Sequence, residues 1–258
     1  MSTLIDTHCH LTDMDNSQIE AVIARAKSAG VNKLICIGAS KGTESSFRAV
    51  EIANQYPEVY CSVGIHPHDA DQHHWSPDLI SIAKNKKVVA IGETGLDFFK
   101  NWSDFDAQRT LFIKSINIAK DLKKPLVIHC RDAFEECVQV LENEGAAEIG
   151  GVFHCFSGTA YQAEILSRLN FLVSYTGLLT FKNSTEIKEN AALIPLSCIM
   201  LETDCPYMAP EPYRGKTSEP AHVAIIAETL SKVHKTSIDE VKIQTTNNAL
   251  RLFPLLSH

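Results

Sequence analysis

The sequence predicts an α/β protein, a (β/α)8 TIM barrel that forms one domain over residues 1–258. Three observations lead to this prediction. Short apolar runs typical of buried strands alternate with helical patterns along the whole chain. About eight such units fit into the 258 residues, which is the usual size of this barrel. No Gly-x-Gly-x-x-Gly or phosphate-loop pattern follows the first strand, and this disfavours an open nucleotide-binding sheet.

The predicted strands are nearly continuous apolar runs, which are typical of strands covered on both faces. In order they cover residues 4–10, 33–38, 59–64, 88–93, 125–130, 151–155, 171–175 and 198–204. The predicted helices carry apolar residues three or four positions apart. They cover residues 17–29, 43–55, 77–85, 104–122, 133–144, 161–169, 185–192, a stretch after 220, and 238–252. Such regular alternation favours a parallel sheet with right-handed crossovers.

Composition and charge narrow the classes of function. Hydrophobic residues make up 45% of the chain and charged residues 21%, which supports a large core. The net charge of −7 argues against a passive binder of the nucleic-acid backbone, but not against an enzyme that acts on nucleic acid. The chain starts without a basic and apolar leader, and no apolar run reaches about 18 residues. We therefore expect a cytoplasmic protein without a membrane span.

The eight cysteines contain no Cys-x-x-Cys pair, so a zinc ribbon or a thioredoxin-type motif is not expected. Cys9, Cys130, Cys155 and Cys205 each follow a His or Asp that we expect to point into the barrel. Strand alternation then turns these thiols outward, toward the helices. We interpret them as small buried hydrophobic residues in a reducing cytosol, not as ligands.

Potential metal ligands collect at the carboxyl ends of the predicted strands, where barrel enzymes keep their chemistry. His8 and His10 are two residues apart, so they share one face of the first strand. The ends of later strands carry His66, Glu93, His129, His154 and Asp204. Scattered core histidines would not gather at one end of so many strands. The sequence therefore predicts a metal site at this end.

Four histidines and two carboxylates are too many for one tetrahedral ion with an open position, but they suit two ions that share a ligand. We place His8, His10 and Asp204 on one ion and His129 and His154 on the other, with Glu93 as the bridge. The formal charge of such a site is about +2, which could attract a phosphate to an acidic protein. Two ions can also hold a hydroxide nucleophile and polarise a phosphorus–oxygen bond.

A series of motifs spans nearly the whole chain. They are Ile5-Asp-Thr-His-Cys-His10, Val63-Gly-Ile-His-Pro-His68, Ile91-Gly-Glu-Thr-Gly-Leu-Asp97, Ile128-His-Cys-Arg-Asp-Ala133, Phe153-His-Cys-Phe-Ser-Gly158, Leu201-Glu-Thr-Asp-Cys-Pro-Tyr207 and Thr245-Thr-Asn-Asn-Ala249 with Arg251-Leu-Phe253. Together they resemble the TatD-type metal-dependent deoxyribonucleases, a branch of the metal-dependent hydrolases. The resemblance implies a (β/α)8 fold and metal binding by the same six residues. It also implies 3′→5′ exonuclease action on single-stranded DNA.

Further residues at the strand ends have two interpretations, and the sequence leaves both open. His66 is expected to bind a phosphate oxygen or protonate the leaving oxygen; the alternative is a hydrogen bond that fixes a ligand. Arg131 could bind phosphate through its planar guanidinium, or pair with Asp132 or a loop acid. Glu202 could orient a ligand histidine or a substrate group, or form a simple buried ion pair.

The predicted loops contain several aromatic rings that could stack nucleobases or pack as a lid: Phe98, Phe99, Trp102, Phe156, Tyr207 and Tyr213. Of these, Tyr207 is our candidate substrate contact. Asp97 and Asp106 are interpreted as loop and cap residues, and His68 as structural or exposed. His73, His74, His222, His234 and His258 are interpreted as ordinary surface or helix residues. Thr217-Ser218 precede Glu219-Pro220 where the family often has Arg-Asn, which leaves the substrate preference open.

The predicted function is a metal-dependent deoxyribonuclease with two divalent ions, Mg²⁺, Mn²⁺ or Zn²⁺, and with DNA as its transient partner. A hydroxide held by the ions and aligned by Asp204 attacks phosphorus, and His66 or a water on the ions assists the leaving 3′-oxygen. Four imidazoles favour zinc, manganese or iron over magnesium. We expect a monomer.

Two alternatives remain. One is an ester or amide hydrolase of the same fold, such as a D-aminoacyl-tRNA deacylase, because the ligands do not select the bond. The other is a non-catalytic nucleic-acid-binding protein with a structural metal. Structural sites are usually closed and rich in sulfur, which disfavours the second alternative.

Overall fold

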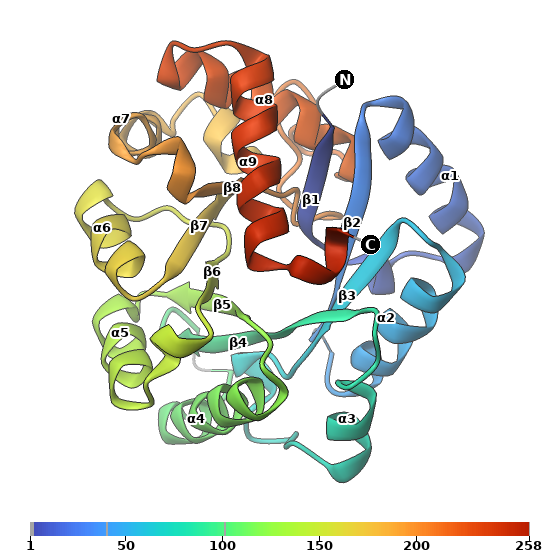
Figure 1. Cartoon of the computed structure of the whole chain (residues 1–258), viewed down its shortest axis with the longest axis vertical. Helices are drawn as coiled ribbons and strands as arrows, with labels where there is room; N and C mark the ends of the chain where they lie inside the picture. The colour runs from blue at the N-terminus through green and yellow to red at the C-terminus, as the bar shows by residue number, and fades with distance from the viewer. Residues whose placement is uncertain (1–2, 40, 101, 258) are drawn as a thin grey trace.

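Parallel strands form a ring with helices around it in the computed structural model, which describes residues 3–39, 41–100 and 102–257 (Figure 1). The eight strands of this sheet follow one another in chain order. They are β1 (Leu4–Cys9), β2 (Val31–Gly38), β3 (Val59–Val63), β4 (Val88–Asp97), β5 (Leu126–Arg131), β6 (Gly151–Phe153), β7 (Phe171–Tyr175) and β8 (Ile199–Leu201). The predicted (β/α)8 barrel is confirmed.

Contacts between the ends of β1 and β8 bring the first and last strands of the sheet together. Cys9 and Cys205 form a parallel bridge. The backbone N–H of His10 donates to the carbonyl of Cys205 at 2.7 Å, and that of Asp204 donates to the carbonyl of His8 at 2.9 Å. These bonds hold two of the predicted ligands of β1 beside the predicted ligand that follows β8.

Helices follow the strands and cover the outside of the ring (Figure 1). They are α1 (Asn16–Ser28), α2 (Glu44–Gln55), α3 (Pro77–Ile82), α4 (Phe105–Leu122), α5 (Phe134–Asn143), α6 (Ala160–Arg168), α7 (Thr185–Leu193), α8 (Val223–His234) and α9 (Ile238–Leu252). Each lies within a few residues of a predicted helix. In the part of the chain that the structure describes, no helix is long and apolar enough to cross a membrane.

Three predicted strand ends are wrong. The strand predicted over 151–155 stops at Phe153, and the one predicted over 198–204 stops at Leu201. Cys155 and Asp204 have φ angles of 48° and 57°, which a strand cannot accommodate. In contrast, β4 continues to Asp97, because its residues beyond Glu93 still pair with β5.

Apolar residues form two layers. The larger layer lies between the strands and the helices, and includes Leu34, Phe112 and Ile116. The other fills the inside of the barrel with side chains such as Ile35, and Phe253 and Leu256 at the end of the chain pack against it. Figure 1 shows α9 and the C-terminal segment lying across one end of the barrel. This packing closes the end where the strands begin, so the opposite end is left for the polar site.

The first turn of α9 depends on Ser237, whose side chain accepts the backbone N–H of Glu240 at 3.1 Å. We expect Ser237→Ala to lower the free energy of unfolding by about 1 kcal/mol, because a helix N–H loses its partner. Ser237→Asp should retain the stability, since its carboxylate can cap the helix in the same way. Urea denaturation of the three proteins measures the difference. Equal midpoints for wild type and the alanine variant would contradict this interpretation.

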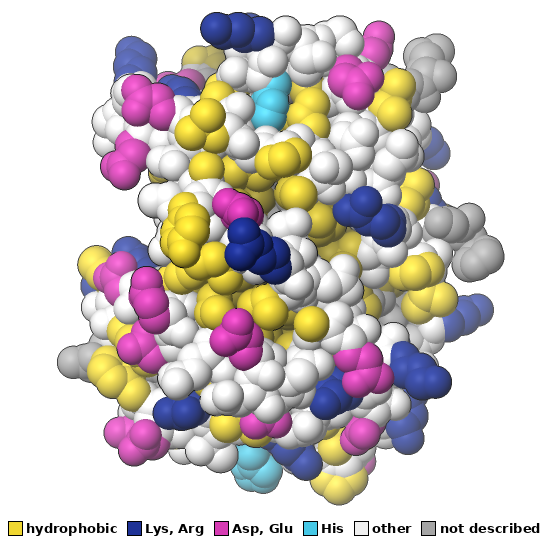
Figure 2. All heavy atoms as spheres, turned by 60° about the vertical axis from the view of Figure 1, so that its left-hand side comes forward, with side chains coloured by type: hydrophobic (Ala, Val, Ile, Leu, Met, Phe, Trp, Pro, Cys, Tyr) yellow, Lys and Arg dark blue, Asp and Glu magenta, His cyan; other side chains and the backbone are white. Residues whose placement is uncertain are grey.

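All eight cysteines are free thiols. Cys9 and Cys205 are fully buried, as expected, whereas Cys130 and Cys155 are only half-buried. The outer face of α5, α6 and α7 carries clustered apolar side chains (Figure 2). Among them, Tyr161 and Leu193 are exposed beside a groove of about 430 Å³ between α6 and α7.

Candidate metal centre

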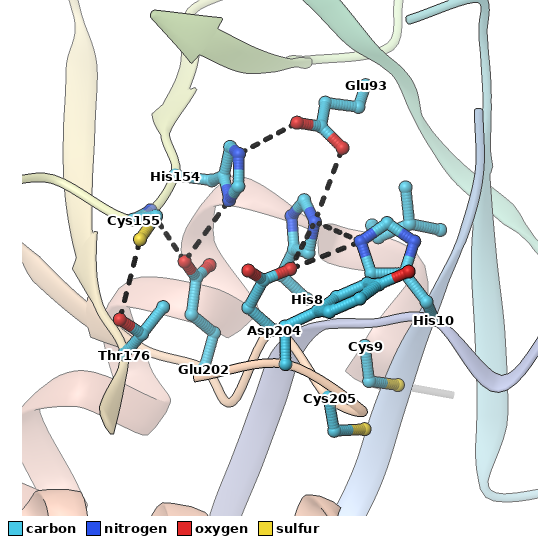
Figure 3. A network of polar contacts seen from close by, with 12 residues as sticks. His8, Cys9, His10, Glu93, His154, Cys155, Thr176, Glu202, Asp204 and Cys205 are labelled. Carbon is cyan, nitrogen blue, oxygen red and sulfur yellow. Dashed lines mark hydrogen bonds and ion pairs between the residues drawn. The ribbon is translucent and has the colours of Figure 1, made fainter. Parts of the chain in front are cut away.

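The six predicted metal ligands lie together at the carboxyl end of the barrel. His8 and His129 lie within β1 and β5, and Glu93 lies in the middle of the long strand β4. His10, His154 and Asp204 follow the ends of β1, β6 and β8. Figure 3 shows His8 and His10 of the β1 segment, Glu93 of β4, and His154 and Asp204 after β6 and β8 turned toward one another.

Glu93 is almost fully buried and its two oxygens face different groups of ligands. Oε1 lies 2.9 Å from Nδ1 of His129 and 2.8 Å from Nε2 of His154. Oε2 lies 3.5 Å from Nε2 of His8, on the other side (Figure 3). This is the arrangement that a carboxylate needs to bridge two cations.

Two glycines let β4 approach β5 closely around this carboxylate. Gly92 and Gly95 have φ angles of 143° and 136°, which favour glycine. A Cβ atom at either position would collide with the carbonyl oxygen of Val127 or His129. The Gly-Glu-Thr-Gly sequence therefore places Glu93 and His129 side by side.

The donor atoms fall into two groups, each close enough for one ion. In the first, Asp204 Oδ1 lies 3.2 Å from Nε2 of His10 and 3.7 Å from Nε2 of His8. The Nε2 atoms of His8 and His10 are themselves 3.2 Å apart. In the second group, which Glu93 Oε1 completes, His154 Nε2 and His129 Nδ1 are 3.4 Å apart.

This donor set fits metal ions. Imidazole nitrogens and carboxylate oxygens that face one another attract positive charge, and a divalent cation can supply this charge to several of these atoms at once. The set mixes nitrogen and oxygen donors, as divalent transition metals and zinc require. The division into His8, His10 and Asp204 on one side and His129 and His154 on the other, with Glu93 between, remains a prediction about ligation.

The site attracts positive charge. Burial alone would raise the pKa of Glu93, but the charges of His154 and His66 and the hydrogen bonds from His129 and His154 lower it well below its usual value. The pKa of Asp204 is also lowered. Burial alone would raise it, but the hydrogen bond and the charge of His10 outweigh burial. Burial also works against protonation of His154, yet Glu93 and Glu202 raise its pKa well above the usual value. Both carboxylates are thus ionised and available as ligands.

Asp97 belongs to this site, so its interpretation as a loop or cap residue is wrong. It is the last residue of β4 and is fully buried. Its Oδ2 lies 3.0 Å from Nε2 of His129 and 2.7 Å from Nε2 of His68. Asp97 therefore holds the ring of His129 by the nitrogen that faces away from Glu93, a common support for a metal-binding histidine. Glu93, Gly95 and Asp97 are two residues apart, so on a strand their side chains point to the same face. A predicted strand that continued to Asp97 would therefore have placed Asp97 beside Glu93.

Glu202 supports the other histidine of the second group. Its Oε1 lies 3.4 Å from Nδ1 of His154 (Figure 3). The backbone N–H of Cys155 and the hydroxyl of Ser174 also donate to the carboxylate, each at 2.6 Å. Of the alternatives left open for Glu202, these contacts favour orientation of a ligand histidine.

His66 lies beside the second group, with Nε2 3.4 Å from Oε1 of Glu93. Its Nδ1 accepts the backbone N–H of His68 at 3.1 Å, so the ring proton of neutral His66 is on Nε2 and points toward the site. Burial lowers the pKa of His66 to about 4. At neutral pH the ring is therefore a hydrogen-bond donor without a net charge.

The predicted substrate contacts lie at the mouth. Arg131 is exposed, and within the described residues no carboxylate forms an ion pair with it. Its expected alternative, pairing with Asp132 or a loop acid, is therefore not found there. Tyr207 is exposed and its hydroxyl donates to Oδ2 of Asp13 at 2.9 Å. The Tyr207 ring lies 5.9 Å from the ring of His10.

The other loop aromatics divide by exposure. Phe99 and Trp102 are exposed, whereas Phe156 is buried. The Phe98 ring packs 4.4 Å from that of Phe105, and the Tyr213 ring stacks 4.8 Å from that of His222. His222 is buried and ends the short 3-10 helix Pro220–His222, so the structure supports its interpretation as a helix residue and not as a surface residue. His258 lies outside the described residues.

Comparison with known proteins identifies the family. The family model described as TatD related DNase matches residues 5–254. An uncharacterized metal-dependent hydrolase of Bacillus subtilis, YabD, is 39% identical over 97% of this chain and 98% of its own length. The 3′-5′ ssDNA/RNA exonuclease TatD of Shigella flexneri is 34% identical over 88% of this chain and 89% of its own.

A solved structure agrees with the sequence matches. The TatD homologue YJJV of Escherichia coli superposes with a TM-score of 0.88 at 29% identity, and the match covers 97% of this chain and 98% of that one. The resemblance seen in the motifs is thereby confirmed. The chain belongs to the family of TatD-related DNases and is a metal-dependent hydrolase.

Proposed function

We propose that this chain hydrolyses phosphodiester bonds of single-stranded nucleic acid, and that it removes nucleotides from the 3′ end with two divalent ions bound. The observation that carries the proposal is Glu93, with one oxygen toward each group of donors. A bridged pair of ions suits in-line displacement at phosphorus. The activity in the name of the Shigella flexneri relative supports the choice of substrate.

The residues of the site have two roles, metal binding and orientation of the metal-binding side chains. His8, His10 and Asp204 would hold one ion, His129 and His154 the other, and Glu93 both. Bound there, divalent ions supply Lewis-acid polarisation of the phosphoryl group and activation of water. The chain contributes the geometry, because Asp97 forms a hydrogen bond with the ring of His129 and Glu202 lies 3.4 Å from the ring of His154 before any ligand arrives.

Two residues act on the reacting groups. Asp204 is ionised and lies at the edge of the first group, where it can accept a proton from the attacking water. His66 donates its Nε2–H to a non-bridging phosphate oxygen. Since its pKa is lowered to about 4, it serves as a neutral donor, which favours phosphate binding over protonation of the leaving oxygen.

The test is turnover of a short 5′-labelled single-stranded DNA by metal-stripped protein, with Mg²⁺, Mn²⁺ or Zn²⁺ restored in turn. We expect stepwise release of mononucleotides that needs a metal and disappears in His129→Ala, which removes a donor of the second group. Intact DNA with every metal would contradict the proposal. Release of amino acid from a D-aminoacyl-tRNA under the same conditions would instead establish ester hydrolysis.

A further inference from the structure

Aromatic and cationic side chains gather at one side of the barrel mouth, after β4 and at the end of β5. They are Phe99, Lys100, Trp102 and Arg131, and we call them the mouth platform. The guanidinium of Arg131 lies 3.7 Å above the centre of the Phe99 ring. Lys100 Nζ lies 5.2 Å from the Phe99 ring and 5.8 Å from the Trp102 ring. Among the described residues no carboxylate forms an ion pair with either cation. Exposed rings beside such cations provide a face for a base and charges for a phosphate.

The mouth platform is attached to the metal centre through one carboxylate. Oδ1 of Asp97 accepts the backbone N–H groups of Phe99 and Lys100 at 3.0 and 3.2 Å. Oδ2 of the same carboxylate lies 3.0 Å from Nε2 of His129. The position of the two loop residues is therefore set by the group that orients a predicted metal ligand.

The mouth platform faces Tyr207 across the mouth. In a ring of strands in chain order, β4 and β5 lie opposite β8 and β1. Tyr207 follows β8 and contacts His10, whereas Trp102 follows β4 and packs edge-on against His68 with ring centres 4.4 Å apart. The metal centre lies between these exposed rings. A single strand that crosses the centre would thus meet an aromatic ring on each side of the scissile bond.

We propose that the mouth platform binds the nucleotide on the polymer side of the scissile bond. Its base stacks on Trp102 or Phe99, and its phosphate pairs with Arg131 and Lys100. The platform has two exposed rings and two cations, which suits a continuing chain, whereas across the mouth the hydroxyl of Tyr207 is already held by the carboxylate of Asp13. This inference rests on the proposed function and specifies its substrate as an unpaired strand, because a duplex leaves no base face free.

The first test compares two substrates. Decathymidylate fills the polymer side, whereas the p-nitrophenyl ester of thymidine 5′-monophosphate lacks a nucleotide there. We expect Trp102→Ala to lower the ratio of their kcat/KM values by about 10-fold, since one stacked base is lost. Arg131→Ala should lower the ratio as well and weaken its dependence on salt, because one phosphate contact is removed.

Two control variants change similar side chains at the other end of the barrel. Leu193→Ala removes an exposed apolar side chain at the end of α7, and Arg251→Ala removes a charge near the end of α9. Both should leave the ratio unchanged. A ratio that stays at the wild-type value in Trp102→Ala and in Arg131→Ala would overturn the proposal.

The second test measures binding without turnover. The chain has two tryptophans, and Trp75 is buried, so quenching by decathymidylate in metal-free protein reports on Trp102. We expect saturable quenching, with an apparent Kd raised about 10-fold in Phe99→Ala. No quenching, with or without metal, would overturn the platform even in an active nuclease. If decathymidylate quenches Trp102 saturably but is not hydrolysed with any metal, the result supports binding at the mouth platform and contradicts the proposed function.

Discussion

Glu93→Gln is expected to reduce kcat/KM on single-stranded DNA by on the order of 10³-fold or more, equivalent to about 4 kcal/mol of barrier. The amide has nearly the same shape as the carboxylate but lacks its charge. Glu93 is the residue whose oxygens face both groups of donors, so its neutralisation weakens both predicted ion sites at once. Steady-state kinetics, with metal content measured by mass spectrometry, checks the prediction.

Thermal unfolding of the metal-free variant shows whether the fold persists. Glu164→Gln is the matched control, because it removes the same charge from an exposed ion pair on α6. This control should keep the wild-type rate. Wild-type turnover by Glu93→Gln with both metals bound would defeat the bridging role.

Asp97→Asn is expected to lower the affinity for metal by about 10- to 100-fold, as seen when a carboxylate behind a ligand histidine is lost. Asp97 holds Nε2 of His129 and thereby turns Nδ1 toward Glu93. The uncharged amide supports this orientation less well and makes the imidazole a weaker ligand. Competition with a chelator of known affinity measures the change.

Saturating metal distinguishes support from ligation. At high metal concentration Asp97→Asn should regain much of its activity, whereas Glu93→Gln should not. Asp121→Asn, an exposed change on α4, is the control and should bind metal like the wild type. Unchanged affinity in Asp97→Asn would show that Asp97 does not orient His129.

The sequence predicts the barrel and the ligand set for the same reason. Strands buried on both faces are short and apolar, so a polar side chain at the end of such a strand is conspicuous. This pattern predicts His8, His129 and Glu93 as ligands, and the structure brings them together with the other three predicted ligands. Alternation on β1 placed His8 and His10 on the same side, and their Nε2 atoms lie 3.2 Å apart.

The ends of the strands could not be predicted as well, because pairing between distant segments decides them. β4 continues to Asp97 since β5 lies beside it, and this pairing makes Asp97 part of the site. β8 stops before Asp204, which has a left-handed backbone and donates its N–H to the carbonyl of His8 at the junction with β1. Hydrogen bonds between segments far apart in the chain cannot be predicted from the pattern of neighbouring residues.

The sequence by itself determined the order of strands and helices and the chemical types of the predicted metal ligands. The periodicity of apolar residues depends only on near neighbours in the chain, so strands and helices can be predicted from the sequence. Only the tertiary structure decided which oxygen of Glu93 faces which histidine, and that Asp97 and Glu202 stand behind two of them. It also decided that Phe99 and Trp102 stay exposed while Phe156 is buried. These outcomes depend on how loops from separate strands pack at one end of a ring, which is a property of the assembled barrel.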